Sequence, residues 1–454
     1  MHSAKDPFGN AITLQQPESA AAVRDFVEGF LAYEPRVLAV LAAAEHDASL
    51  IVQACAAALY MFSESPSGVP RARAHLQRAA AAALPCTERE RLFASAVQQW
   101  VDGQVGDSLA THALLARGFP RDLAALKLGQ YHVFNLGDAP TMLRLALQCA
   151  PAAPEVAWLH GMLAFGHEQC HNLAQAEAAA RHALRLRPAE PWAEHALAHV
   201  MLTEGRHAEG AAFMQRASAH WQGLSSFMRC HNWWHLALFQ IELGDTAAAL
   251  ALFDQQVWGV DKSYSQDQVG AVSLLARLEL AGLAGPVDEA GSAALASGPR
   301  WDELATHLAD RVGDQVQPFL DLQYLYGLAR AQRPEADALL ANMQQYALAA
   351  PPISQVAWQQ AAMPAARGLV AHARGQWAVA ADELAQALPW LARIGGSHAQ
   401  RELFEQVYRD ALARSGQWAT VLNLVKPLAN AQPQSRRLAQ QLAQTQQALN
   451  LPRI

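Results

Sequence analysis

The stretch at residues 157–188 reads AWLHGMLAFGHEQCHNLAQAEAAARHALRLRP, and it ends on a proline that belongs to a regular series. Pro120, Pro154 and Pro188 follow one another at intervals of 34 residues. Turn residues follow the same 34-residue interval. They lie seventeen residues before each position of the proline series, and they are Gly103, Gly137, Gly205 and, in the quoted stretch, His171-Asn172. A period of this length predicts a repeated structural unit.

Each period has the pattern of two helices joined by a turn. Alanine is abundant, and it combines the highest helix propensity with a side chain small enough for close packing of helices. The closing proline ends the second helix because it lacks an N–H and disfavours helix at the preceding residue. The apolar signature positions of the tetratricopeptide repeat are occupied in the quoted stretch by Leu163, Ala164, Ala176 and Ala183. We therefore predict an all-α fold, a superhelix (α-solenoid) of tetratricopeptide-like helical hairpins.

The positions of the prolines and turn residues also predict how the repeats are arranged along the chain. Repeats are expected to begin near Arg89, Leu123, Ala157, Pro191 and Cys230. We expect a single array over residues 1–454, divided into irregular N-terminal helices (1–88), regular repeats (89–257), irregular helical hairpins (258–360) and C-terminal repeats with a capping helix (361–454).

Two helix starts carry capping signals. Thr87 and Glu90 have the spacing of a capping box at the first regular repeat. Asp245, directly after the turn glycine Gly244, is expected to cap the second helix of the fifth repeat.

Composition excludes several functional classes. Hydrophobic residues make up 52% of the chain and charged residues 17%, which is typical of a folded protein. The net charge of −7 and the lack of a basic stripe argue against nucleic-acid binding. No apolar run is long enough for a membrane helix, and no signal peptide is visible. Five scattered cysteines without a Cys-x-x-Cys motif favour a reducing, cytoplasmic location.

Two pairs of histidines have the spacing of one helix face. His195 and His199 are four residues apart, and so are His231 and His235. Both pairs fall on the first helix of adjacent repeats, where first helices pack side by side and line the concave groove of the tetratricopeptide class. We therefore expect the four imidazoles to converge.

A convergent set of four histidines predicts a site for a divalent transition metal such as Zn²⁺. Asp267 and Asp321 are possible carboxylate ligands from later helices. There are two alternatives without metal: a groove of polar and aromatic residues that binds a ligand, and buried histidines that satisfy helix carbonyls in a tight core. The H-E-x-x-H zinc motif is absent because Ala196 stands in place of its glutamate.

Three further residues are assigned to the candidate groove. Asn232 and Trp234 stand between the histidines of the second pair. Arg401 follows the loop Gly395-Gly396-Ser397-His398, and it could bind an anionic ligand if it turns inward.

Several of these segments resemble the tetratricopeptide repeat protein 38 family. The likeness runs over nearly the whole chain and implies chiefly the helical repeat fold, with both histidine pairs matching the family pattern. Its most specific segment is Cys-His-Asn-x-x-His. The segments that carry the resemblance are Asp6 to Ala22, Trp192-Ala-Glu-His-Ala-Leu-Ala-His199, Gly210 to Gln215, Cys230-His-Asn-Trp-Trp-His-Leu-Ala-Leu238, and Gly395-Gly-Ser-His-Ala-Gln-Arg401 with Phe404.

Three functional hypotheses follow. The first is a protein that binds a peptide, protein or small-molecule ligand in the concave groove, because helical repeats serve recognition. The second is a metal-dependent enzyme, of hydrolase or oxidase type, that uses the histidine cluster. The third is a structural scaffold for oligomers.

Overall fold

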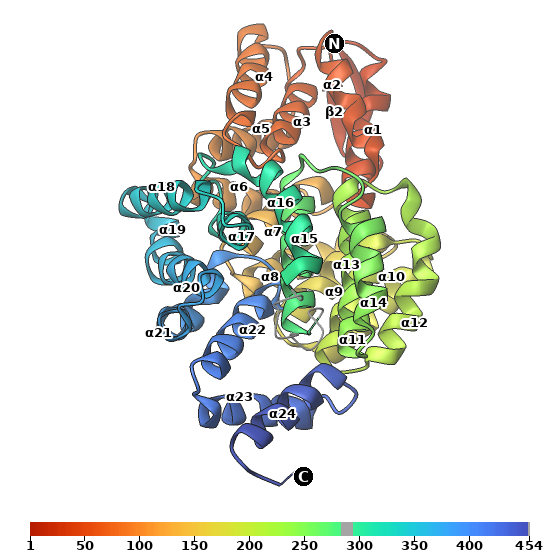
Figure 1. Cartoon of the computed structure of the whole chain (residues 1–454). Helices are drawn as coiled ribbons and strands as arrows, with labels where there is room; N and C mark the ends of the chain where they lie inside the picture. The colour runs from red at the N-terminus through yellow and green to blue at the C-terminus, as the bar shows by residue number, and fades with distance from the viewer. Residues whose placement is uncertain (283–293, 453–454) are drawn as a thin grey trace. The chain divides into compact units, whose positions relative to one another are not determined.

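The computed structural model describes residues 1–282 and 294–452, and their regular structure is almost entirely helical. The chain divides into two compact units, one formed by Met1–Leu197 with His220–Met228 and the other by Ala198–Ala219 with Arg229–Ile454. Figure 1 labels the helices of both units.

The first unit begins with a two-stranded hairpin and continues as helices that pair with their neighbours. The hairpin, a feature that the sequence analysis missed, is antiparallel and pairs His2 with Leu14. The elements of the first unit, up to Leu197, are β1 (His2–Lys5), β2 (Ala11–Leu14), α1 (Ser19–Ala32), η1 (Pro35–Leu38), α2 (Ala39–Ala44), α3 (Leu50–Met61), α4 (Gly68–Ala82), α5 (Glu88–Val101), α6 (Val105–Gly118), α7 (Leu123–Asn135), α8 (Ala139–Cys149), η2 (Ala150–Ala152), α9 (Ala157–Gln169), α10 (Leu173–Leu186) and the first part of α11 (Pro191–Thr203).

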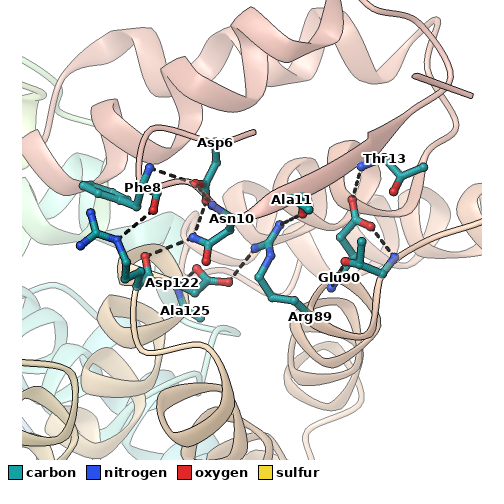
Figure 2. Close-up of polar contacts among 11 residues, drawn as sticks. Asp6, Phe8, Asn10, Ala11, Thr13, Arg89, Glu90, Asp122 and Ala125 are labelled. Atoms are coloured by element: carbon teal, nitrogen blue, oxygen red, sulfur yellow. Dashed lines mark hydrogen bonds and ion pairs between the residues drawn. The ribbon is translucent and has the colours of Figure 1, made fainter. Parts of the chain in front are cut away.

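The β-hairpin is held against the first regular repeat by buried polar contacts. Figure 2 shows Arg89 donating to the carboxylate of Asp122 over 2.7 Å and to the carbonyl of Ala11 over 3.3 Å. Glu90 accepts a hydrogen bond from the N–H of Thr13 over 2.7 Å. Arg89 and Asp122 are both buried, so the N-terminal strands are an integral part of this unit.

The turns between paired helices use left-handed backbone conformations. Gly103 and Gly137 have φ values of 75° and 71°, which glycine adopts without steric penalty. In the equivalent turn before α10 the sequence has His171-Asn172, and asparagine is the residue of this pair that is usual in turns. In the structure it is His171 that takes the left-handed conformation, with φ 57°. Asn172 follows as the N-terminal flanking residue of α10, with φ −84°.

The second unit continues with helices that pair in the same way along the chain. It contains the rest of α11, then α12 (His207–Ala217) and, from Arg229 on, α13 (Ser226–Glu242). Most of η3 (Ser218–Gly223), from His220 on, and the start of α13, up to Met228, belong to the first unit. The later elements of the second unit are α14 (Thr246–Leu252), η4 (Phe253–Val257), α15 (Ser265–Leu280), α16 (Ala294–Leu308), η5 (Ala309–Arg311), α17 (Pro318–Arg330), α18 (Glu335–Ala349), α19 (Pro352–Val356), η6 (Ala357–Ala362), α20 (Met363–Ala373), α21 (Trp377–Ala387), η7 (Leu388–Ile394), α22 (His398–Arg414), α23 (Trp418–Ala431) and α24 (Arg436–Ala448).

Small residues allow close helix packing in this unit. A Cβ atom added to Gly210 on α12 would lie 2.3 Å from the ring of Phe239 on α13. The ring therefore occupies the space that any larger residue would need. A continuous apolar core follows from α13 to α22 and includes Trp234, Trp301 and Trp358.

The helices begin where the repeat period predicts. α5, α7, α9 and α11 start at Glu88, Leu123, Ala157 and Pro191. The capping box at Thr87 is present, and Asp245 accepts a hydrogen bond from the N–H of Ala248 at the start of α14. The prediction of an all-α fold built from tetratricopeptide-like hairpins is confirmed, while the division of the chain into four parts stays a prediction.

Candidate metal centre

Two helices supply the four histidines. α11 begins after Glu190, whose carboxylate accepts a hydrogen bond from the N–H of Ala193 over 2.5 Å and so caps the helix. His195 and His199 follow on successive turns of this helix, and His231 and His235 lie on successive turns of α13. The spacing of four residues places each pair on one helix face.

The four histidines meet as a group. Each offers one ring nitrogen, and these four atoms all lie within 4.8 Å of one another. The ring centroids of His199 and His235 are 4.5 Å apart, and those of His231 and His235 are 4.9 Å apart. The division between the two units falls inside α11, so His195 belongs to the group through the unbroken helix that also carries His199. The predicted convergence of the imidazoles is confirmed.

All four side chains are buried, with exposed fractions between 0 and 8%. Burial, reinforced by neighbouring His199, lowers the pKa of His231 to about 3. The His231 imidazole is therefore neutral at pH 7, which is the form that can coordinate a metal ion.

Aromatic rings orient two of the imidazoles. The ring of Trp234 stacks on His231 with an interplanar angle of 9° and a centroid distance of 5.2 Å. The ring of Trp192 stacks on His195 with an angle of 20° and a distance of 4.4 Å. Trp234 was expected to line an open groove, but only 1% of its surface is exposed, and it packs in the apolar core because of its size.

Asn232, the other residue assigned to the groove from this segment, is fully buried. Among the residues that the structure describes, neither atom of its amide has a hydrogen-bond partner. The histidines, Asn232 and Trp234 therefore lie inside the packed helices, where we had expected an open groove surface.

The two aspartates belong to the second unit, on α15 and α17. Asp267 on α15 accepts a weak hydrogen bond from the thiol of Cys230, with 3.7 Å between sulfur and oxygen. Burial, and then the carboxylate of Asp267, raise the pKa of that thiol. Asp321 on α17 is fully buried, and burial, with a further contribution from the charge of Asp314, raises the pKa of its carboxyl well above the usual range. Neither aspartate belongs to the histidine group, contrary to the expectation that they complete it.

Arg401 turns onto the loop before its own helix. Its guanidinium donates to the carbonyl oxygens of Gly395 and Gly396. Ser397 caps α22 by accepting from the N–H of Gln400, and the side chain of Gln400 completes a capping box. The loop before α22 is therefore organised by its own capping contacts and by the guanidinium of Arg401.

The sequence did not lead us to Arg277, which contacts the ring of Trp234. Arg277 on α15 is buried, and its guanidinium carbon lies 5.4 Å from the centroid of the Trp234 ring. The available signal was an arginine within the apolar run AVSLLARLEL at residues 271–280. A charged residue in such a run is buried only with partners, so it marks a structured polar contact in the core.

Comparisons with known proteins add little to this description. No protein-family model matches the chain. One solved structure with similarity is described as "Structure of Naa15/Naa10 bound to HypK-THB"; it is 14% identical over 80% of this chain and 66% of that chain, with a TM-score of 0.25. The chain thus spans slightly under two thirds of that protein, and a similarity this low supports no conclusion about partner or activity. In the part of the chain that the structure describes, no helix is both long and apolar enough to cross a membrane.

Proposed function

We propose that His195, His199, His231 and His235 bind one divalent transition metal ion and that this repeat protein is a metalloprotein. The observation that carries the proposal is the meeting of four buried imidazoles with their ligand atoms within 4.8 Å of one another. Imidazole is a common ligand for zinc, copper, iron and nickel.

The spacing of the nitrogens fits one ion. Zn–N bonds of 2.0–2.1 Å in a tetrahedron place the nitrogens roughly 3.4 Å from one another. The nitrogens, which lie within 4.8 Å of one another, must therefore approach by at most about 1.4 Å, which rotations of the imidazoles can supply. The ion would also compensate the cost of burying four polar rings in an apolar environment.

The donor set also indicates what the ion would do. Four histidines complete the tetrahedral shell that Zn²⁺ prefers and leave no position for a substrate, which is the arrangement of a structural site. We therefore infer that a bound Zn²⁺ joins α11 to α13 and stabilises the fold.

Metal analysis tests this proposal directly. The full chain, purified without an affinity tag that binds metal, is dialysed against Zn²⁺ and then against metal-free buffer, and metal is measured by mass spectrometry. One ion per chain is expected for the natural sequence, and His199→Asn and His235→Asn are expected to lose it. His207→Asn is the matched control, because His207 is buried one helix away and does not belong to the group. Retention of metal by both cluster variants, or no metal in the natural protein, would refute the site.

A catalytic role for the same centre is the second candidate. An ion that takes six ligands, such as Fe²⁺ or Ni²⁺, would keep two positions for water and substrate beside four histidines, as metal-assisted hydrolysis or oxidation requires. The buried and neutral His231 favours binding of such an ion at neutral pH. Turnover by the Fe²⁺ or Ni²⁺ form, absent from the Zn²⁺ form and from His199→Asn, would distinguish this role from the structural one.

Three further predictions stay proposals. Recognition of a peptide, protein or small molecule is supported by the helical repeats, and pulldown with the full chain tests it. Membership in the tetratricopeptide repeat protein 38 family is supported by the Cys-His-Asn-x-x-His segment at residues 230–235. A cytoplasmic location is supported by five unpaired cysteines, and imaging of the tagged protein tests it.

A further inference from the structure

A cavity of about 270 Å³ lies within the second unit, away from the histidine group. Its walls come from the end of α15 and from α22, α23 and α24. Three of the lining side chains are Arg409, Arg414 and Arg437, and we call this space the arginine cavity. Among the described residues that line it, Asp410 is the one acidic residue.

Two of the arginines are anchored by acidic partners. Arg437 forms ion pairs with Glu242 over 2.6 Å and with Glu402 over 3.1 Å. Arg414 forms an ion pair with Asp410 over 2.7 Å, and Asp410 also contacts His372 over 2.9 Å. These contacts hold the walls of the cavity in place, and both contacts of Asp410 are made by its Oδ2 atom.

Arg409 is different, because its hydrogen bonds are incomplete. It is 97% buried, and its closest carboxylates, those of Glu402 and Glu405, lie at 3.7 and 3.8 Å. Those distances are too long for hydrogen bonds. Among the described residues, Nε and Nη2 of Arg409 have no hydrogen-bond partner. These two atoms have almost no accessible surface and so do not face the cavity. Arg409 nevertheless lines the cavity, so a ligand there would reach its guanidinium through the remaining nitrogen, Nη1.

Glutamines of α24 add neutral polar groups to the opposite wall. Gln440, Gln441 and Gln444 line the cavity. Their amides can donate and accept hydrogen bonds without adding negative charge. A wall of arginine and glutamine side chains is suited to an anion and unsuited to a cation or an apolar molecule.

We propose that the arginine cavity binds a small anion that bears a carboxylate or phosphate group, with Arg409 as its main hydrogen-bond donor. A hydrogen bond from a guanidinium N–H to either group is charge-assisted and therefore strong. A volume of about 270 Å³ limits the ligand to the size of a small metabolite. This site is separate from the proposed metal centre and does not depend on it.

Calorimetric titration of the full chain tests the proposal. The probes are inorganic phosphate and succinate, with sodium chloride at matched ionic strength and the neutral succinamide as references. Saturable binding of phosphate or succinate is expected, and the probe that binds more tightly identifies the anionic group. Arg409→Met is expected to weaken binding by roughly 10–100-fold. Arg367→Met is the matched control, since Arg367 is an exposed arginine of the same unit that pairs with Glu383 outside the cavity.

Two outcomes would overturn the site. One is the absence of saturable binding of both anions to the natural protein. The other is unchanged affinity in Arg409→Met. If that variant is unfolded by circular dichroism, Gln444→Leu replaces it, because Gln444 is exposed on α24 and lines the cavity. Unchanged affinity of a folded Gln444→Leu protein for phosphate and succinate would then refute the proposed anion site.

Discussion

The guanidinium of Arg277 lies over the indole ring of Trp234, with 5.4 Å between its central carbon and the ring centroid. The same indole stacks on the imidazole of His231, with 5.2 Å between the ring centroids. Arg277 also donates to the hydroxyl of Ser273 over 2.5 Å and to the carbonyl of Ala399. It therefore connects α15 and α22 to the ring that orients a proposed metal ligand.

Arg277→Met is expected to weaken metal binding as well as the fold. The variant removes the cation–π contact and the donor to Ala399, with a loss of about 2–4 kcal/mol of unfolding free energy. Looser orientation of His231 is expected to reduce metal affinity by roughly 10–100-fold. Urea unfolding and a competitive zinc titration measure the two effects. Arg374→Met, at an exposed arginine paired with Asp337, is expected to change neither, and equal effects in both variants would contradict this role.

The metal-free protein is expected to lose stability as the pH falls from neutral. The pKa of His231 is about 3 in the folded chain against 6.5 for the free side chain, so the unfolded chain binds more protons between these values. The contribution of His231 to the free energy of unfolding is fully present above pH 6.5 and is lost as the pH falls toward 3. It amounts to a few kcal/mol in order of magnitude. Urea unfolding of chelator-treated protein at several pH values measures it. A His231→Gln variant is expected to show a shallower pH dependence, and parallel curves for the two proteins would contradict the prediction.

Arg89→Met is expected to destabilise the first unit strongly. It leaves the buried carboxylate of Asp122 without its 2.7 Å ion pair and removes a donor to the β-hairpin, with an expected loss of about 3–5 kcal/mol. Arg73→Met is the control, because Arg73 and Asp102 form a largely exposed pair worth at most about 1 kcal/mol. Thermal unfolding distinguishes the two, and similar losses would show that burial of Arg89 does not matter.

Two glycines of the second unit are expected to respond in opposite directions to alanine. Gly210→Ala places a Cβ 2.3 Å from the ring of Phe239 and is expected to destabilise by about 1–3 kcal/mol. Gly270→Ala on α15 meets no atom within 4 Å, so the higher helix propensity of alanine is expected to add about 0.5–1 kcal/mol. Denaturant unfolding of both variants gives the signs. A stabilised Gly210→Ala protein would mean that α12 and α13 can move apart without loss of stability.

The period of the repeat predicted most of the helix starts because each depends on local signals. Proline spacing, turn glycines and caps such as Thr87 act within a few residues of the boundary that they set. The pairing of histidines on one helix face is equally local, and the meeting of the two faces followed from the stacking of adjacent repeats. These features needed no knowledge of distant contacts.

What the sequence did not predict depends on contacts between distant segments. The β-hairpin needs Arg89 and Glu90, which lie more than seventy residues away along the chain. Trp234 is buried because α15 packs over it with Arg277, and no pattern within α13 contains that information. The same holds for Asp267, whose partner is the thiol of Cys230.

The histidine group has one more consequence, which concerns the order of synthesis. All four histidines lie within the short segment between His195 and His235, whereas the arginine cavity needs residues from Leu280 to Gln444. Domains fold as they leave the ribosome, N-terminal part first. We therefore expect ribosome-bound chains from which α11 to α22 have emerged, and α24 has not, to retain metal, which their metal content measures. The cell's metal supply at the moment of translation, and not after release, would then decide which ion this protein carries.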